Sequence, residues 1–312
     1  MPDPAARRRP LKVGVILPDT EREMGGADPK WRDIAAMARQ AEGLGFDSLW
    51  VFDHLLYRFP DKPTQGPWEC WSLLAALAAV TERAEIGPVV SCAGYRNPAL
   101  LAKMADTVDE ISGGRLVLGL GAGWHQPEYE AFGYPYDHRV SRFAEALAIV
   151  SGLLRHGSVD FAGTYHTARD CELRPRGPRP GGPPIMVGSS APRMLALLAA
   201  HGDLWNAWAR QTVEEVAADR ALVDAALAAN GRDPATVGRS VALLVDTPDA
   251  TGRPSEEKPG LKARTPAELA EHLLAYAALG LDHVQLMIDP NTPAGLEWAA
   301  RALEEVDRAG PA

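Results

Sequence analysis

The chain has 312 residues, of which 46% are hydrophobic, 23% charged and 7% aromatic, a balance typical of a globular protein and not of a disordered or fibrous one. Its 32 Lys and Arg against 41 Asp and Glu give a net charge of −9, which argues against nucleic acid as a partner because phosphate binding needs a clustered basic face. No apolar run approaches the roughly 18 residues of a membrane span, and none follows the arginines at 7–9 as the core of a signal peptide would.

The cysteines and the lack of a targeting segment predict a cytoplasmic protein. Cys70, Cys92 and Cys171 are an odd number without CxxC spacing, which fits a reducing compartment better than a disulfide framework or a zinc ribbon. The metal-binding spacings HxH and HExxH are missing, and so is the GxSxG of serine hydrolases. We therefore expect neither a metal site nor a serine nucleophile.

After residues 1–10, a Pro- and Arg-rich stretch that we predict to be a disordered tail, apolar runs alternate with helical patterns. The first run, LKVGVIL at 11–17, stops at Pro18, as expected of a buried parallel strand. In chain order, the predicted strands are 11–17, 48–52, 85–91, 115–121, 184–188, 203–208, 239–246 and 282–288, and the predicted helices are 31–44, 68–83, 98–112, 140–155, 192–201, 213–230, 266–279 and 294–308.

This alternation predicts an α/β fold, a single (β/α)8 barrel domain over residues 11–312. Parallel strands joined by helices need right-handed crossovers, and eight such units close a barrel. An open, doubly wound sheet is the alternative. The first strand is followed by PDTEREMGGA and not by a tight glycine fingerprint, so the dinucleotide signature of that alternative is missing where it belongs.

Two segments depart from the alternation. Residues 157–183 contain alternating β-type residues around Gly163 and then a Pro and Gly tract, which predicts a hairpin and loop insertion before the fifth strand. Residues 247–262 are polar, rich in Pro and Gly, and follow the seventh strand. A mobile lid over the barrel mouth and a merely solvated loop are both consistent with this composition.

In a barrel, reactive groups lie at the carboxyl ends of the strands. The candidates at these ends are Asp53, His54, Ser91, Cys92, Tyr95, Arg96, Asn97, Gly121, Gly123, Trp124, His125, Gly188, Ser189, Ser190, Asn206, Trp208 and Arg210. His54 is the best acid–base candidate, because a histidine just behind a strand end and an aspartate can be poised near neutral pH. The alternative is a histidine that only hydrogen-bonds a neighbouring loop.

The junction IMVGSSAPR at 185–193 has the pattern of a phosphate cradle. An apolar strand leads to a glycine, two serines and then Pro192 at a first helical position. Such a junction presents backbone N–H groups and the positive end of a helix dipole, and Arg193 adds charge. An ordinary helix start is the alternative interpretation.

Several tryptophans lie near predicted rim loops, where they either pack in the core or wall a pocket. Trp50 and Trp298 have the pattern of packing residues, whereas Trp68, Trp71, Trp124, Trp205 and Trp208 lie in or beside the rim. We expect some of these to line an apolar pocket, with Trp68, Trp124 and Trp208 as substrate contacts. The glycines of GLGAGW at 119–124 fit no dinucleotide motif, so we expect them to give space for a ring or a tight turn.

Four stretches carry a family resemblance: GLGFDSLWVFDHLL at 43–56, YRNPALLAKMADTVDEISGGRLVLGLGAGWHQPEYEAFG at 95–133, PPIMVGSS at 183–190 and GDLWNAW at 202–208. On these, from residue 11 to about 308, the chain resembles the bacterial luciferase-like flavin and deazaflavin oxidoreductases. Within that superfamily it is most similar to members that depend on the deazaflavin coenzyme F420.

The resemblance implies a barrel with a flavin or deazaflavin ring across its carboxyl end. It implies a non-proline cis peptide at the end of the third strand, which would be the Ser91–Cys92 bond, and a cofactor phosphate at Gly188, Ser189 and Ser190. Asp53 and His54 would lie near the reactive face of the ring, where His54 handles a proton or contacts the substrate. The full set of implied cofactor contacts is Asp53, His54, Ser91, Cys92, Gly121, Gly123, Gly188, Ser189, Ser190 and Asn206.

The implied activity is F420-dependent hydride transfer with an apolar or planar organic substrate. Sugar-phosphate oxidation is not expected, because Trp124, His125 and Pro127 stand where those relatives carry acidic residues and an asparagine. One alternative is a two-component monooxygenase that uses O2 and reduced FMN from a separate flavin reductase; another is a non-catalytic flavin-binding protein. The resemblance also implies a homodimer, for which the apolar helix at 68–83 is a candidate surface unless it is buried against its own barrel.

Overall fold

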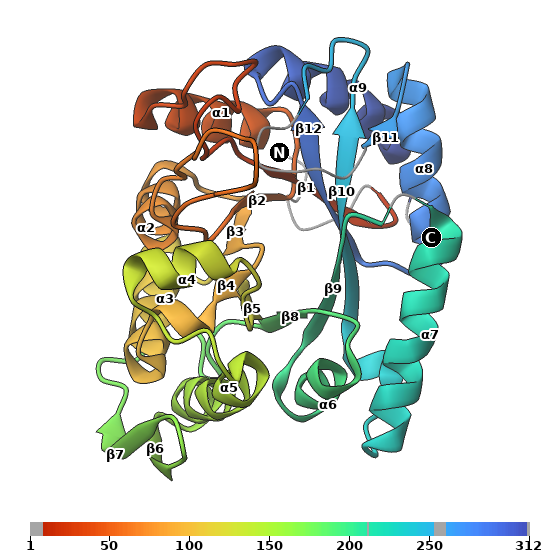
Figure 1. The fold of residues 1–312 in the computed structure, drawn as a ribbon. Helices are drawn as coiled ribbons and strands as arrows, with labels where there is room; N and C mark the ends of the chain where they lie inside the picture. Colours follow the sequence, from red (N-terminus) through yellow and green to blue (C-terminus); the bar gives the residue numbers. More distant parts are fainter. Residues whose placement is uncertain (1–8, 211, 253–259, 311–312) are drawn as a thin grey trace.

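The computed structural model describes residues 9–210, 212–252 and 260–310, which form a parallel barrel surrounded by helices (Figure 1). The barrel strands are β1 (Lys12–Ile16), β2 (Ser48–Val51), β3 (Glu85–Pro88), β4 (Ser91–Cys92), β5 (Leu118–Gly121), β8 (Ile185–Gly188), β9 (Leu204–Trp208), β10 (Gly238–Asp246) and β12 (His283–Asp289). The helices that follow the strands are α1 (Trp31–Gly43), α2 (Cys70–Val80), α3 (Pro98–Ser112), α5 (Arg139–His156), α6 (Pro192–His201), α7 (Val213–Ala229), α8 (Pro266–Ala278) and α9 (Pro293–Ala309).

The order of the strands shows that the sheet closes on itself. Neighbouring strands pair in the order β3-β2-β1-β12-β10-β9-β8-β5-β4, and all these pairs are parallel. The two ends of this order, β3 and β4, are successive parts of one barrel strand. A parallel bridge between Ile86 and Leu116 joins the same seam. The predicted (β/α)8 barrel is therefore confirmed, and the open-sheet alternative is wrong.

The predicted elements are present, and most of their ends differ from the prediction by a few residues. The main difference is the third strand, predicted as 85–91, which is interrupted at Val89 and Val90. The peptide bond between those two valines is cis, so the expected cis bond at Ser91–Cys92 was wrong by two positions. The structure also contains a short helix, α4 (Gln126–Phe132), that the sequence pattern did not predict.

The insertion before the fifth barrel strand is an antiparallel hairpin, as predicted. It consists of β6 (Ser158–Ala162) and β7 (Thr167–Glu172), which lie beside α5 at the edge of the molecule (Figure 1). The carboxylate of Glu145 on α5 accepts three backbone N–H bonds from the hairpin turn, each 2.8 Å long, from Thr164, Tyr165 and His166. These bonds fix the hairpin to the helix.

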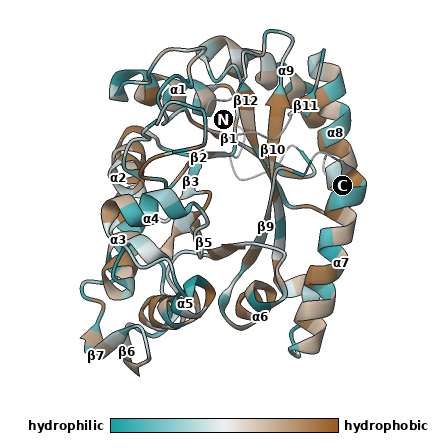
Figure 2. Cartoon of the chain, viewed as in Figure 1, coloured by the Kyte–Doolittle hydropathy of each residue, from teal (hydrophilic) through white to brown (hydrophobic). Residues whose placement is uncertain are grey.

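Two apolar layers hold the barrel together. Leu and Val side chains pointing outward pack against the helices, whereas inward side chains such as Trp50, Met186 and Leu244 fill the barrel interior. Strands buried on both faces need such continuous apolar runs. Helices α7 and α8 carry both brown and teal residues (Figure 2), as expected of helices with one face on the core and the other toward solvent.

Arg9 and Asp307, which lie near the two ends of the described residues, form an ion pair. Arg9 is only 8% exposed, and its Nε donates to Asp307 Oδ1 over 2.7 Å. The predicted disordered tail at 1–10 therefore does not extend to Arg9, while residues 1–8 lie outside the described residues. Along the described part of the chain, every helix is too short or too polar to serve as a membrane span.

The predicted lid at 247–262 falls partly outside the described residues, which omit 253–259. Before that gap, the backbone N–H groups of Thr251 and Gly252 donate to the carboxylate of Asp289 at the end of β12. The segment therefore starts at the carboxyl end of the barrel. Its role as a lid remains a prediction.

Candidate active site

A cavity of about 790 Å³ lies at the carboxyl ends of the barrel strands. Most of the residues predicted from the sequence line it: Asp53, His54, Cys92, Gly121, Gly123, Trp124, Gly188, Ser189, Ser190, Asn206 and Trp208. Ser91 and Trp68 are not among its lining residues. The cavity has the size of a typical cofactor or substrate site.

The interrupted third strand shapes one side of the cavity. The side chain of Val90 lies against β5 and β8, both of which have glycine at the point of contact. A Cβ atom on Gly121 would come within 2.8 Å of Val90 Cγ2, and one on Gly188 within 3.0 Å of Val90 Cγ1. A larger residue at Gly121 would therefore overlap this valine, and one at Gly188 would press against it.

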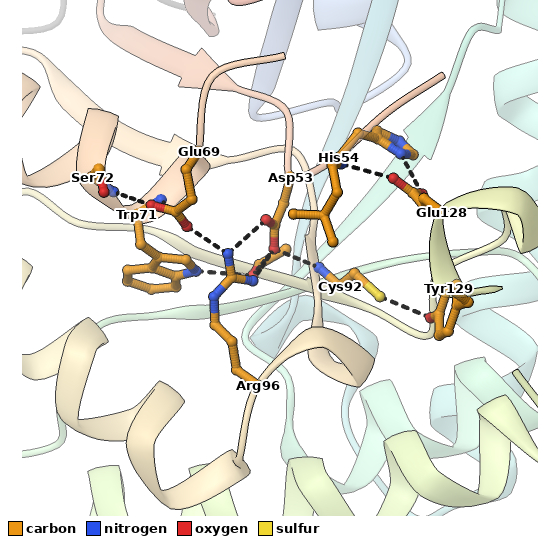
Figure 3. A network of polar contacts seen from close by, with 11 residues as sticks. Asp53, His54, Glu69, Trp71, Ser72, Cys92, Arg96, Glu128 and Tyr129 are labelled. Atoms are coloured by element: carbon orange, nitrogen blue, oxygen red, sulfur yellow. Dashed lines mark hydrogen bonds and ion pairs between the residues drawn. The ribbon is translucent and has the colours of Figure 1, made fainter. Parts of the chain in front are cut away.

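Asp53 is buried and fully hydrogen-bonded (Figure 3). Its Oδ2 accepts from the Ser91 hydroxyl at 2.6 Å and from the Cys92 N–H at 2.9 Å. Arg96 donates to both carboxylate oxygens, at 2.6 and 2.9 Å. Burial alone lowers the pKa of Arg96, but the Asp53 carboxylate outweighs it and raises the pKa above its usual value. Asp53 therefore joins the end of β2 to the start of β4, and these contacts favour a positioning role over proton transfer.

The same network reaches the first turn of α2. Arg96 Nη2 lies 2.7 Å from Glu69 Oε1, and Glu69 caps the helix by accepting from the N–H groups of Trp71 and Ser72. Burial raises the pKa of Glu69, but these hydrogen bonds outweigh it and lower the pKa overall. Trp71 Nε1 in turn donates to Ser91 Oγ at 3.1 Å. Ser91 and Trp71 thus support the site from behind, without lining the cavity.

His54 forms a pair with Glu128, which comes from the unpredicted helix α4 (Figure 3). The distance between His54 Nδ1 and Glu128 Oε1 is 2.8 Å, and Glu128 Oε2 accepts from the Leu55 N–H at 2.8 Å. Burial raises the pKa of Glu128, but hydrogen bonds from His54, Leu55 and Tyr95 outweigh it, so that the pKa is lowered and the carboxyl is ionised. An ionised acceptor fixes the proton of His54 on Nδ1.

The other nitrogen of His54, Nε2, has no hydrogen-bond partner among the described residues. Because His54 lines the cavity, this nitrogen is available as an acceptor from a bound molecule. A histidine oriented by a buried carboxylate is a recurring arrangement for general acid–base chemistry.

Cys92 lines the cavity as a neutral thiol. The Tyr129 hydroxyl donates to the Ala122 carbonyl at 2.9 Å and lies 2.9 Å from Cys92 Sγ, so the thiol is the donor in the second contact. Burial raises the pKa of Cys92 to about 12, which excludes a thiolate at neutral pH. A Cβ on Gly123 would overlap Tyr129 Oη, and Gly123 has a φ of +72°. This glycine therefore makes room for a tyrosine and a turn, and not for a cofactor ring.

Aromatic side chains wall the cavity on the side of His54. Trp124 lies 5.6 Å from the His54 ring and 6.3 Å from Phe59, and the rings of His54 and Tyr57 are 4.6 Å apart. Two further lining residues, Phe52 and Trp208, form an edge-to-face pair at 5.5 Å. Such walls favour flat or apolar ligands.

Two other rim tryptophans, Trp68 and Trp205, do not line the cavity. Trp68 is 51% exposed and donates to the Pro29 carbonyl, away from the cavity, so its predicted contact with a substrate has no support from its position. Trp205 is fully buried between barrel and helices, and its Nε1 donates to the Ser189 carbonyl at 3.0 Å. Trp205 therefore holds the predicted phosphate cradle in place.

The cradle lies where the N-termini of two helices reach the cavity. Neither α5 nor α6 has a side-chain N-cap. Arg139 and Val140 at the start of α5 line the cavity, as do Ala191 just before α6 and Met194 in its first turn. Arg139 of α5 donates to the Gly123 carbonyl and stacks 4.3 Å from Tyr136, while Arg193 of α6 donates to Ser141. Uncapped N–H groups, helix dipoles and the Arg139 charge give this end of the cavity a positive potential suited to an anion.

Within the described residues, no cluster of three or more His, Cys, Asp or Glu has the geometry of a metal site. The three cysteines are unpaired.

A closed barrel with its cavity at the carboxyl ends of the strands is the architecture of (β/α)8 enzymes. The model of one such family, the luciferase-like monooxygenases, matches residues 11–257, and the chain belongs to this family.

Individual relatives within this family differ in what they do. The chain is 34% identical to 5,10-methylenetetrahydromethanopterin reductase of Archaeoglobus fulgidus over 56% of its own length and 49% of the reductase, so it spans about half of that relative. It is 32% identical to F420-dependent hydroxymycolic acid dehydrogenase of Mycobacterium tuberculosis over 78% of its length and 64% of the dehydrogenase. It is 30% identical to pyrimidine monooxygenase RutA of Cronobacter turicensis over 97% of its length and 86% of that enzyme.

Among solved structures, an F420-dependent secondary alcohol dehydrogenase in complex with an F420–acetone adduct superposes with a TM-score of 0.80 at 18% identity. The match covers 95% of this chain and 99% of that one. At this identity the similarity establishes the fold.

Sequence reasoning missed Glu128 because it did not predict α4. The signals were present in QPEYEAFG: Pro127 in the first turn and Gly133, with a φ of +75°, at the C-cap. Tyr57, Phe59 and Arg139 were missed for a different reason. They come from loops and a helix start that reach the cavity only once the barrel is closed.

Proposed function

We propose that this protein is an F420-dependent oxidoreductase that catalyses hydride transfer with an apolar or planar organic substrate. One observation carries the proposal. A single cavity joins a positively polarised end, formed by the starts of α5 and α6, to an aromatic end that contains the oriented His54–Glu128 pair. The F420-dependent dehydrogenase among the relatives supports the choice of cofactor.

The residues present fit such a cofactor. The cavity of about 790 Å³ suits a tricyclic ring with its side chain. Gly188, Ser189 and Ser190 would hold the phosphate, with Arg139 beside them, and Val89, Val90 and Cys92 would support the ring. The cradle needs its glycine, because a Cβ at Gly188 would press against Val90.

When bound, F420 supplies or accepts a hydride at its deazaflavin ring. His54 would exchange the accompanying proton with the substrate through Nε2, while Glu128 stabilises the imidazolium and holds the ring in place. Tyr57, Phe59 and Trp124 exclude water from that end of the cavity. Asp53 and Arg96 keep the third strand in the conformation that forms the cavity wall.

The competing function is an FMN-dependent monooxygenase that receives reduced flavin from a separate reductase. The match to a pyrimidine monooxygenase over 97% of this chain favours it. The two functions share the barrel and the cradle, but oxygen activation needs the N5 and C4a positions of a true flavin. A non-catalytic flavin-binding protein would retain the cofactor site without turnover.

Cofactor titration separates these functions. The purified protein is titrated with F420 and with FMN, and cofactor oxidation or reduction is then followed across neutral alcohols, aldehydes and planar heterocycles. We expect tighter binding of F420 and a substrate-dependent change in its absorbance. Tighter binding of FMN together with O2-dependent turnover would favour the monooxygenase, and binding without turnover would favour the non-catalytic protein.

Substitution of His54 tests the proton-transfer role. His54→Gln should bind the cofactor within about twofold of the wild type and lose roughly 100-fold or more in turnover. His156→Gln, at the exposed C-terminus of α5, is the matched control and should retain full activity. Unchanged turnover in His54→Gln would remove the role assigned to this histidine.

The quaternary structure and the cellular location also remain proposals. We propose a cytoplasmic homodimer, supported by exposed apolar side chains at Trp68, Leu100 and Ile111, which are 51%, 54% and 46% exposed. Helix α2 itself buries most of its apolar residues against its own barrel. Sedimentation equilibrium of the wild type and of Leu100→Glu checks the dimer, which the charged variant should weaken.

A further inference from the structure

Hydrogen bonds from Asn206 to Ser240 and Gln285, on neighbouring barrel strands, fix the orientation of one side-chain amide in the cavity wall. Asn206, near the carboxyl end of β9, is 3% exposed and lines the cavity. Its Nδ2 donates to Ser240 Oγ at 3.0 Å and to Gln285 Oε1 at 2.9 Å. Its Oδ1 has no hydrogen-bond partner among the described residues.

The neighbours of Asn206 favour this orientation over the reverse. Ser240 donates its only hydroxyl proton to the Trp205 carbonyl at 2.9 Å, so toward Asn206 it acts as an acceptor. Gln285 is fully buried, and its Nε2 has no partner among the described residues. Turning both amides would cost Ser240 its bond to Trp205 and would still leave one Gln285 atom unpaired. The observed arrangement therefore makes one more hydrogen bond.

As a result, a carbonyl oxygen without a partner among the described residues faces the cavity. The cavity lining includes the buried apolar residues Val89, Ala207 and Met287, and Gly188 of the cradle is paired with Asn206 across β8 and β9. An unpaired amide oxygen in such surroundings favours a ligand that brings an N–H group to it.

We propose that Asn206 Oδ1 accepts a hydrogen bond from the imide N–H of the bound ring and so selects cofactors that carry this group. The inference rests on the proposed function, because it assumes a flavin or deazaflavin ring in the cavity. In the oxidised state both ring systems carry a single ring N–H, at N3 between two carbonyl groups. Asn206 is thus a binding residue for the pyrimidine end of the cofactor, distinct from the His54 end.

A chemical double-mutant cycle tests the contact. The probes are F420 and its N3-methyl derivative, with FMN and N3-methyl-FMN as a second pair. Binding of each is measured to the wild type and to Asn206→Leu, which keeps the branched shape of the side chain and removes the acceptor. In the wild type, N3-methylation should weaken binding about tenfold. In Asn206→Leu the parent cofactor should lose a similar factor, and N3-methylation should change its affinity by less than about twofold.

The wild type alone provides a second measurement in case Asn206→Leu does not fold. With ¹⁵N3-labelled FMN or the equivalently labelled deazaflavin, the N3 proton of the bound ring should give a slowly exchanging, downfield-shifted signal. Ser189→Ala, in the cradle that follows the neighbouring strand β8, is the matched control variant. It should weaken both members of each probe pair equally, because the proposed partner of Ser189 is the phosphate and not N3.

The outcomes separate the two proposals. If neither F420 nor FMN binds the wild type, the proposed function fails. If the parent cofactors bind but N3-methylation has the same effect in wild type and Asn206→Leu, or the N3 proton exchanges as fast as in free cofactor, the cofactor site stands and the role of Asn206 is overturned.

Discussion

The Nδ1 atom of His54 lies 2.8 Å from Oε1 of Glu128, although 74 residues separate the two in sequence. One side chain follows β2, and the other lies on the short helix α4 after β5. Closure of the barrel brings these two loops together over the cavity. The pair gives the site a histidine with a defined proton position, which neither residue specifies alone.

Replacement of Glu128 tests this relationship. Glu128→Gln keeps the shape but removes the charge that stabilises a protonated His54, so we expect turnover to fall roughly 10- to 100-fold while cofactor affinity stays within about twofold. Steady-state kinetics and cofactor titration measure the two quantities. Glu130→Gln, on the exposed face of the same helix, is the control, and equal losses in both variants would contradict the pairing.

Arg96 pairs with two carboxylates, Asp53 and Glu69, and we expect their replacement to change the free energy of unfolding by different amounts. Asp53→Asn leaves a guanidinium in a site where its side chain is only 10% exposed, and we expect a loss of about 2–4 kcal/mol in the free energy of unfolding. Glu69, the other partner, has a side chain that is 44% exposed, so Glu69→Gln should cost less than about 1 kcal/mol. Urea unfolding measures both, and a larger loss for Glu69→Gln would contradict this assignment.

Because Val90 packs against Gly121, a larger residue at position 121 should clash with Val90, and a smaller residue at position 90 should relieve that clash. Gly121→Ala places a methyl group within 2.8 Å of Val90 Cγ2, so the third strand must shift, and cofactor affinity should fall about tenfold. The double variant Gly121→Ala/Val90→Ala should recover most of that loss. Failure of the second substitution to restore binding would show that Val90 is not the residue that requires glycine here.

The tryptophans provide a test of which aromatic residues contact the substrate. Trp124 lines the cavity and Trp68 does not. Trp124→Ala should raise the KM for planar substrates about tenfold with little change in cofactor affinity, because it removes an aromatic wall beside His54. Trp68→Ala should leave KM unchanged; an equal effect from Trp68 would place it in the substrate site after all.

The hairpin anchor predicts a pH-dependent stability. Burial raises the pKa of Glu145, but the three N–H bonds from the hairpin turn outweigh it and lower the pKa below the usual 4.5. A carboxyl whose pKa is lowered by folding stabilises the protein above its unfolded pKa, and that contribution disappears as the pH falls through the folded pKa. Glu145→Gln should therefore lower Tm at pH 7, and the difference from wild type should shrink as the pH falls below about 4.5.

Thermal unfolding of the wild type, Glu145→Gln and the exposed control Glu110→Gln over that pH range checks this expectation. A Tm difference between wild type and Glu145→Gln that stays constant down to low pH would show that the charge of Glu145 does not hold the hairpin.

Much of the fold was predictable because its signals are local. Short apolar runs, amphipathic segments and the glycines and prolines between them depend on a few neighbouring residues, so the strand and helix pairs and the hairpin insertion were found correctly. The interruption of the third strand was not predicted, and the cis peptide bond was expected two residues too late. Val89 and Val90 have the same apolar character as the strand around them, and the contacts of Val90 with Gly121 and Gly188 are to other strands.

The candidate site was predictable to the extent that strand ends identify it. His54, Asn206 and the Gly188 cradle were found because parallel strands bring their carboxyl ends to one side of a barrel. Glu128 and the orientation of the Asn206 amide were not. Of the three rim tryptophans expected at the substrate, Trp124 and Trp208 line the cavity and Trp68 does not. These properties depend on contacts between segments far apart in the chain.

The amino-acid sequence by itself determined a barrel of alternating strands and helices, a Gly-Ser-Ser junction between a strand and a helix after Val187, and a histidine at the barrel mouth, since each follows from periodicity or from the order of a few residues. Only the tertiary structure decided which carboxylate orients that histidine, which one pairs with Arg96, and which atom of Asn206 faces the cavity. The physical reason is that hydrogen bonds and side-chain packing act over a few ångströms in space, and the residues they join become neighbours only when the barrel has closed.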